Sequence, residues 1–271
     1  GMCPQRRNNM ADINSSDQAL NGLKVKTDSL PDNWYVTLVN PINGEPGENM
    51  TVARFVELFG SLLYKSQSLP PDGNVFIVYH NKSNNNQLMV EPSRWVGYQN
   101  NGEIADGVAV VEGGKILVIA PTEAAIAGLK WSSTAVIGGG TTTNNRSTAI
   151  NDWNGKSNTA EQITHTECSG ASYAPGYCAQ YSRVNTNGQG ITAGMWWLPS
   201  LGEMMMIYAN KRKINYALSL IKGAAQITES GYWTSTEYGD AYAWYLSLVD
   251  GYAYTITKYT NELRVRPVSF L

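Results

Sequence analysis

The residues able to perform acid–base, nucleophilic or metal chemistry are few in this chain. Its only histidines are His80 and His165, and its only cysteines are Cys3, Cys168 and Cys178. No H-E-x-x-H, phosphate-binding loop or paired C-x-x-C places such groups at the spacing that a catalytic or zinc site needs. His165 opens an H-x-E triplet like that of zinc deaminases, but the required P-C-x-x-C is missing. The sequence therefore predicts a protein that is not an enzyme and uses no metal or cofactor.

Cys168 and Cys178 lie in a stretch rich in Gly, Ser and Tyr. They are close enough in sequence to form a disulfide, whereas cysteines of cytoplasmic proteins usually stay reduced. Whether the two residues are paired stays open at this point.

Charge and hydropathy narrow the set of partners. Lys and Arg total 20 and Asp and Glu total 22, so no basic surface for nucleic acid is expected. No stretch contains the roughly 18 consecutive apolar residues of a membrane-spanning helix, and the N-terminus lacks the apolar core of a signal peptide. We therefore expect no membrane span and synthesis in the cytoplasm, with action outside the cell requiring lysis or transport on a virion.

The aromatic residues have an unusual balance, with 16 Tyr and 8 Trp against 4 Phe. A buried hydroxyl or indole N–H needs a hydrogen-bond partner, so aromatics that only fill a core have no reason to avoid Phe. Tyr and Trp are typical of binding surfaces, where one edge is apolar and the other wet. Tyr and Trp at the rims of ordinary β-sheets are the structural alternative.

The helices and strands that must position the functional side chains are predicted to begin after a polar N-terminal segment. Residues 1–32 have no apolar period, and we expect a disordered or attachment tail. Apolar, β-branched runs predict three strands, at residues 34–39, 74–79 and 87–90. The helical spacing of apolar residues over 51–59 predicts a helix. Residues 33–104 are therefore expected to form a small mixed α/β N-terminal module.

Residues 105–271 are predicted to form a second domain. Apolar runs at 108–112 and 115–120 flank Gly113-Gly114, which supplies the positive φ of a hairpin turn. Residues 131–158, rich in Gly, Thr, Asn and Ser, predict a long irregular loop.

Helix signals follow in the middle of this domain. Asn158 and Glu161 predict one helix start, and Ser200 and Glu203 form the capping box of another. A further short helix is expected over 215–221. From Gly231 onward, apolar and aromatic runs predict four strands, at residues 231–235, 243–248, 253–257 and 262–268, with Asp250-Gly251 as a hairpin turn.

Ten short motifs follow one another along residues 105–271. In sequence order they are Gly107–Val110, Val118–Pro121, Leu129–Trp131, Asn151–Thr159, Ala179–Ser182, Trp197–Glu203, Tyr208–Lys211, Tyr232–Tyr238, Ala243-Trp244 and Arg264–Val268. This ordered set resembles the C-type-lectin-like domain of Bacteroides-associated phage and bacterial display proteins. That family includes variable proteins diversified by retroelements, and its fold is related to that of formylglycine-generating enzymes. A looser likeness to the upstream parts of such phage proteins covers residues 31–56.

The resemblance implies an α+β, C-type-lectin-like fold over 105–271, with twisted antiparallel sheets, two main helices and long loops. It implies a ligand- or receptor-binding protein of a phage or prophage, located on the virion or the cell exterior, that recognises a bacterial surface protein or glycan. Virion tail proteins are further candidate partners, and the sequence leaves open whether the chain forms a homo-oligomer.

Two alternatives carry other functions on the same fold. The first is a bacterial surface adhesin or a pilus-associated protein. The more distant one is a cysteine oxidase of the formylglycine-generating type, for which Cys168 and Cys178 lack the matching motif context. No calcium site is carried over from sugar-binding lectins, because Glu91-Pro92-Ser93 lies outside the lectin-like half.

Diversified members of the family carry a C-terminal cassette of Asn codons whose adenines are randomised, giving codons of the type NNC. Within residues 239–261, only Trp244 and Lys258 lie outside what such codons encode. Seven of the 16 Tyr fall within residues 232–259. Tyr is an efficient recognition side chain because it offers a large area and freezes only two torsions.

Strand alternation separates core from surface in this region. Trp244, Leu246 and Leu248 point to one side, which we expect to be the core, together with Trp233. Arg264 and Arg266 are expected to make structural hydrogen bonds. The remaining polar and tyrosine side chains are expected to form one exposed ligand-binding patch, consisting of Asp240, Tyr242, Tyr245, Ser247, Tyr252, Tyr254, Thr257, Tyr259 and Asn261.

Overall fold

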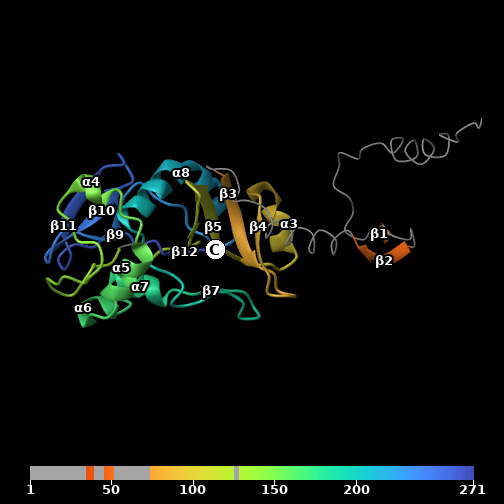
Figure 1. Cartoon of the computed structure of the whole chain (residues 1–271), viewed down its shortest axis with the longest axis horizontal. Coiled ribbons are helices and arrows are strands. Elements are labelled where there is room, and N and C mark those ends of the chain that lie inside the picture. The colour runs from red at the N-terminus through yellow and green to blue at the C-terminus, as the bar shows by residue number, and fades with distance from the viewer. Residues whose placement is uncertain (1–34, 40–45, 52–73, 125–127) are drawn as a thin grey trace, which may run out of the picture. The chain divides into compact units, whose positions relative to one another are not determined.

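The computed structural model describes residues 35–39, 46–51, 74–124 and 128–271 (Figure 1). The chain divides into two compact units, Gly1–Ser66 and Gln67–Leu271, each described here by itself. In the first unit, β1 (Tyr35–Val39) pairs antiparallel with β2 (Pro46–Thr51). The strand expected at 34–39 is thus confirmed over 35–39.

Two further expectations for the N-terminal unit concern residues that the structure does not describe. The tail over 1–32 lies outside the described residues, as does the helix expected over 51–59 apart from its first residue. That residue, Thr51, ends β2.

The second unit is organised around a five-stranded sheet in the order β12-β6-β5-β3-β4, and each neighbouring pair is antiparallel. Its strands are β3 (Asn74–His80), β4 (Gln87–Val90), β5 (Ala105–Glu112), β6 (Lys115–Ile119) and β12 (Val268–Phe270). The turn between β5 and β6 has positive φ at both Gly113 and Gly114, as the hairpin signal predicted.

The domain boundary expected between residues 104 and 105 is not found there, because the two compact units meet between Ser66 and Gln67. β3 pairs with β5 along its length, from Asn74 opposite Val111 to Tyr79 opposite Ala105. Because a central strand must be hydrogen-bonded on both sides, β5 could not be a buried strand of this sheet without β3. Residues 74–104 therefore belong to the same compact unit as the rest of the C-terminal half.

η1 and α3 lie between β4 and β5, and the other helices and two short strands lie between β6 and β9. They are η1 (Pro92–Arg94), α3 (Trp95–Asn100), α4 (Arg146–Ala149), α5 (Gly155–Gln162), α6 (Thr166–Ser169), α7 (Ala174–Gln180), β7 (Arg183–Val184), β8 (Gly190–Ile191) and α8 (Leu201–Leu220). The long loop expected over 131–158 therefore contains α4 and the start of α5.

Helix α8 begins as the sequence predicted and ends later. The Ser200 hydroxyl accepts from the Glu203 amide and the Glu203 carboxylate accepts from the Ser200 amide, which completes the capping box. The separate helix expected over 215–221 is the continuation of α8, because no Gly or Pro interrupts the chain between Gly202 and Gly223.

The start of α5 differs from its prediction. The helix begins at Gly155, three residues before Asn158, so Asn158 lies inside it and caps nothing. Its side chain instead accepts from the Thr141 amide at 2.9 Å and donates to Asp152, also at 2.9 Å. A tertiary contact has therefore taken the polar side chain that the local pattern assigned to a cap.

A second antiparallel sheet has the strand order β11-β10-β9. Its strands are β9 (Gly231–Glu237), β10 (Tyr242–Ser247) and β11 (Ala253–Thr257). The strand expected over 262–268 is not continuous, because only Val268 belongs to β12 while Leu263 and Arg264 make isolated bridges to Leu129 and Tyr232.

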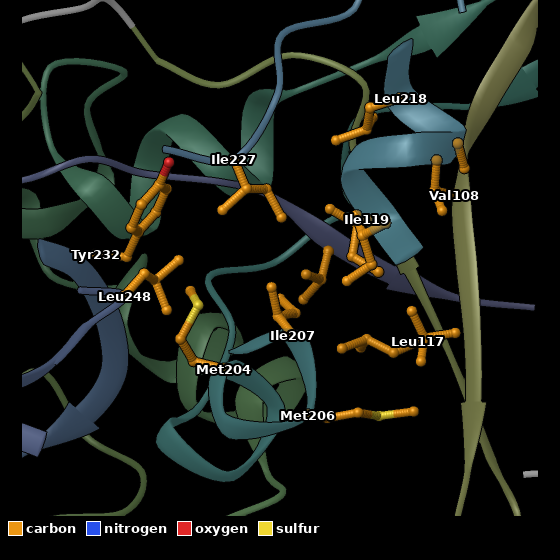
Figure 2. Close-up of a cluster of buried hydrophobic side chains, with 14 of the residues drawn as sticks. Val108, Leu117, Ile119, Met204, Met206, Ile207, Leu218, Ile227, Tyr232 and Leu248 are labelled. Carbon is orange, nitrogen blue, oxygen red and sulfur yellow. The ribbon is translucent and has the colours of Figure 1, made fainter. Parts of the chain in front are cut away.

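Helix α8 contacts both sheets, through β3 and β5 on one side and β9 and β10 on the other. Figure 2 shows Met204, Ile207 and Leu218 of this helix in one apolar cluster with residues from both sheets. The far face of the five-stranded sheet has a smaller core, in which Val118 and Trp196 are buried. The compact unit is thus an α+β domain built on antiparallel sheets. Within residues 105–271, the first strand, β5, and the last strand, β12, are separated in the sheet only by β6.

Candidate functional site

The hairpin of β10 and β11 carries most of the predicted ligand-binding residues (Figure 1). Tyr245 lies opposite Tyr254 in the strand register, and their rings stack with centroids 5.7 Å apart. The ring of Tyr252 lies 4.8 Å from that of Tyr254. We call Tyr245, Tyr252 and Tyr254 the tyrosine cluster.

The members of this cluster differ in exposure. Tyr252 and Tyr254 are 47% and 40% exposed, whereas Tyr245 is half-buried and packs edge-on against Trp233 at 6.5 Å. Burial raises the pKa of the Tyr245 hydroxyl. Tyr245 therefore supports the cluster from the core side, while the other two rings are free to contact a partner.

The turn between the strands holds the exposed rings in place. Gly251 has a φ of 73°, and its amide donates to the Ser247 carbonyl at 2.8 Å. The Asp250 carboxylate accepts from the Tyr252 amide at 3.0 Å and from the Tyr254 hydroxyl at 3.1 Å. The first of these bonds lowers the pKa of Asp250, and the second raises the pKa of Tyr254. The sequence signal Asp250-Gly251 thus determines both the turn and the orientation of a ring.

A residue that sequence reasoning missed completes the cluster. Arg146, the first residue of α4, places its guanidinium carbon 4.0 Å from the centroid of the Tyr252 ring. This distance is within the range of a cation–π interaction. Arg146 lies in the loop region before α5, far in sequence from the hairpin, so no local pattern signals the contact.

Tyr242 belongs to a second group of rings, formed with Tyr238 and Trp244. The Tyr238 ring lies 6.4 Å from Tyr242 and 5.5 Å from Trp244. Alternation along β10 puts Tyr242 on the face of Trp244 and Tyr245 on the opposite face. The expected single patch is therefore divided, and Tyr242 is not joined to the tyrosine cluster by any ring contact among the described residues.

The remaining candidates surround these rings less closely. Asp240 is exposed, and Ser247, Thr257, Tyr259 and Asn261 are half-buried. The Thr257 hydroxyl bonds to that of Thr260 and accepts from the Asn261 amide group, which ties the loop after β11 to itself. The structure brings Ser247 to the base of the turn and leaves Tyr259 without a ring partner among the residues described.

Trp244 and Lys258, which stand out from the cassette pattern, are both buried. The Trp244 indole donates to the Thr143 carbonyl at 2.8 Å. The Lys258 ammonium group pairs with Glu237, donates to the Val136 carbonyl at 2.7 Å and lies 4.3 Å from the centre of the Trp131 ring. Burial lowers the pKa of Lys258 and raises that of Glu237, and the pairing opposes both shifts.

A buried polar network supports the same sheet from the side of α5. The Asp152 carboxylate accepts from the Thr236 hydroxyl at 2.7 Å, the Thr141 hydroxyl at 3.0 Å and the Asn158 amide group at 2.9 Å. These bonds join β9, the loop before α4 and the helix α5. The network was missed in the sequence because its members are separated by many residues.

The two arginines near the C-terminus have the structural role that was expected. Arg264 pairs with Glu123, and Arg266 donates to Glu123 at 3.2 Å and to the Ala120 carbonyl at 3.0 Å. The Tyr232 hydroxyl also donates to Glu123, at 2.9 Å.

Cys168 and Cys178 carry free thiols and are buried in the cluster that also contains Trp131 and Trp233. Burial raises the pKa of Cys168 to about 12 and that of Cys178 well above its usual value. A reactive cysteine is a thiolate in an accessible place, so this environment gives no support to the cysteine oxidase alternative.

The histidines lie apart from the tyrosine cluster. His80 Nδ1 is 2.6 Å from the Asp106 carboxylate, which is buried and whose pKa is raised by that burial. His165 precedes α6 and bonds to neighbouring residues through its backbone. Among the residues that the structure describes, no three His, Cys, Asp or Glu side chains gather in a way that could hold a metal ion.

No helix within the described part of the chain is both long and apolar enough to cross a membrane. Comparisons with protein-family models, curated proteins and solved structures found no match to this chain.

Proposed function

We propose that this chain is a ligand-binding protein of C-type-lectin-like fold, encoded by a phage or prophage, whose tyrosine cluster recognises a molecule on the bacterial surface. One observation carries the proposal. Tyr252 and Tyr254 are held in contact with each other and are 47% and 40% exposed, on a hairpin whose residues Trp244 and Leu246 are buried. Exposed tyrosines of this kind are typical recognition residues.

The core beneath the hairpin supports this assignment. Trp244 and Lys258 are buried, and they are the two residues within 239–261 that a cassette of NNC codons does not encode. If such a cassette varies the hairpin, Trp244 and the buried ion pair of Lys258 with Glu237 are kept while the exposed residues change. The α+β architecture with antiparallel sheets is compatible with the proposed family.

A cell-capture assay tests the proposal. The immobilised full chain is exposed to a panel of gut bacteria, and bound cells are counted. The double variant Tyr252→Ala/Tyr254→Ala should abolish capture, because loss of a hot-spot tyrosine costs about 2 kcal/mol or more of binding. Its thermal unfolding transition should be nearly unchanged.

Tyr216→Ala provides the matched control, since Tyr216 is 56% exposed on α8 and belongs to neither ring group. Capture by the control should equal that of the unmodified chain. Undiminished capture by the double variant would contradict the proposed site.

The phage assignment is tested separately from the site. A bacterial adhesin of the same fold would use the same hairpin, so binding data do not distinguish the two. The neighbouring genes do: phage tail genes, a reverse transcriptase and a template repeat support the proposal, and pilus or surface-anchoring genes support the adhesin.

A further inference from the structure

A cation lies beside the tyrosine cluster without an acidic partner. Arg146 makes no ion pair and no side-chain hydrogen bond with any residue that the structure describes, and its Nε atom is buried and unsatisfied. A buried guanidinium nitrogen without a partner is costly and uncommon. The two Nη atoms of Arg146 are not buried, so they are the donors that an external acceptor could reach.

Four cations of the domain differ from Arg146 because each has an acidic partner. Lys258 pairs with Glu237, Lys211 with Glu229, and both Arg264 and Arg266 with Glu123. Within the tyrosine cluster, the nearby acid Asp250 is already bonded to the Tyr252 amide and the Tyr254 hydroxyl. The guanidinium of Arg146 is thus left for a ligand.

The contact with Tyr252 holds the guanidinium of Arg146 beside the exposed rings, with Cζ 4.0 Å from the ring centroid. A guanidinium is planar, and stacking on a ring uses one face while the N–H groups point outward in the plane. Two of these N–H groups match the two oxygens of a carboxylate in a bidentate bond. Tyr252 therefore keeps the cation close to a ring that is itself 47% exposed.

We propose that the ligand of the tyrosine cluster is an acidic glycan, in which Arg146 binds the carboxylate of a uronic acid while Tyr252 and Tyr254 stack against the sugar rings. The inference deepens the proposed function and depends on it. One cation beside flat aromatic rings fits carboxylates that are separated by neutral, ring-shaped units. A run of acidic amino acids fits less well, because adjacent carboxylates would meet Asp250.

The test uses surface polysaccharide extracted from a strain that the full chain captures. One portion keeps its carboxylates, and in a second portion they are reduced to alcohols, which turns uronic acids into neutral sugars of the same shape. We expect the unmodified chain to bind the native polysaccharide at least tenfold more tightly than the reduced one. Arg146→Gln should lose this preference. Arg146→Lys keeps the charge but cannot form a bidentate bond, so it should retain part of the preference.

Arg94→Gln is the matched control, because Arg94 is an exposed arginine on η1 and takes no part in the ring contacts. It should bind both polysaccharides as the unmodified chain does. If Arg146→Gln does not fold, Arg146→Lys and the reduced polysaccharide still decide the question. Equal binding to native and reduced polysaccharide, or an unchanged preference in Arg146→Gln, would overturn the inference while leaving the proposed function intact.

Two further outcomes also overturn it. If protease treatment of the cells abolishes capture and the extracted polysaccharide does not bind, the ligand is a surface protein. If the full chain captures no cells at all, the proposed function fails and the inference fails with it.

Discussion

Lys258 and Glu237 form an ion pair in which both side chains are completely buried beneath the hairpin of β10 and β11. Glu237 also accepts from the Gly138 amide at 3.0 Å, so the pair connects β9 to the loop that precedes α4. Charges removed from water in this way are tolerated only together. The pair therefore makes the sheet and the loop interdependent.

Removing one partner should be strongly destabilising. Lys258→Met leaves the Glu237 carboxylate buried without compensation, which typically costs about 3–5 kcal/mol of unfolding free energy. The double variant Lys258→Met/Glu237→Gln should recover part of this loss, because its amide is neutral and can still accept from Gly138. Urea denaturation measures both changes, and a double variant no more stable than the single one would contradict the argument.

Truncating Trp244 should destabilise the domain far more than truncating Tyr242, although both residues lie on the same face of β10. Trp244 is buried and its indole is hydrogen-bonded, so Trp244→Ala should cost about 3–5 kcal/mol. Tyr242 is 43% exposed, so Tyr242→Ala should stay within roughly 0.5 kcal/mol. Similar melting temperatures for the two variants would show that assigning Trp244 to the core and Tyr242 to the surface is mistaken.

Gly251 should resist substitution for two reasons. Its φ of 73° is unfavourable for other residues, and a Cβ atom there would overlap the ring of Tyr208. We expect Gly251→Ala to lose more than the roughly 1 kcal/mol that positive φ alone costs. Gly113→Ala is the control, since Gly113 has a φ of 57° and open space around it. Thermal unfolding that ranks the two variants equally would exclude a steric role for Tyr208.

Glu203 should make the domain more stable in mild acid than at neutral pH. Burial raises the pKa of this carboxyl from its usual 4.5 to about 7, so between these values the folded state binds more protons than the unfolded state. Stability then falls as pH rises from 4.5 to 7, by about 3 kcal/mol in total.

Glu203→Gln should remove this part of the pH dependence, because an amide oxygen can still accept from the Ser200 amide and the Trp197 indole. The measurement is the difference in unfolding free energy between the variant and the unmodified chain at pH 5 and at pH 8. Asp106 and Glu237, whose pKa values are also raised by burial, cancel in that difference. A difference that does not change with pH would contradict the raised pKa of Glu203.

The sequence by itself determined the features that depend on neighbouring residues. Gly113-Gly114 predicts its hairpin because two consecutive positive φ values suit glycine, and Ser200 with Glu203 predicts the start of α8 because the capping box is closed within one turn. Alternation alone could also have placed Tyr242 with Trp244, a consequence that the expected single patch overlooked.

Only the tertiary structure decided the contacts between distant segments. The pairing of β3 with β5, the ion pair of Lys258 and Glu237, and the stacking of Arg146 on Tyr252 join residues that no local period relates. Asn158 shows the physical reason, since it had the chemistry of a helix cap but gained stronger bonds to Asp152 and Thr141 inside the fold. Local propensities are worth about 1 kcal/mol or less each, so burial and buried hydrogen bonds override them wherever the chain brings such partners together.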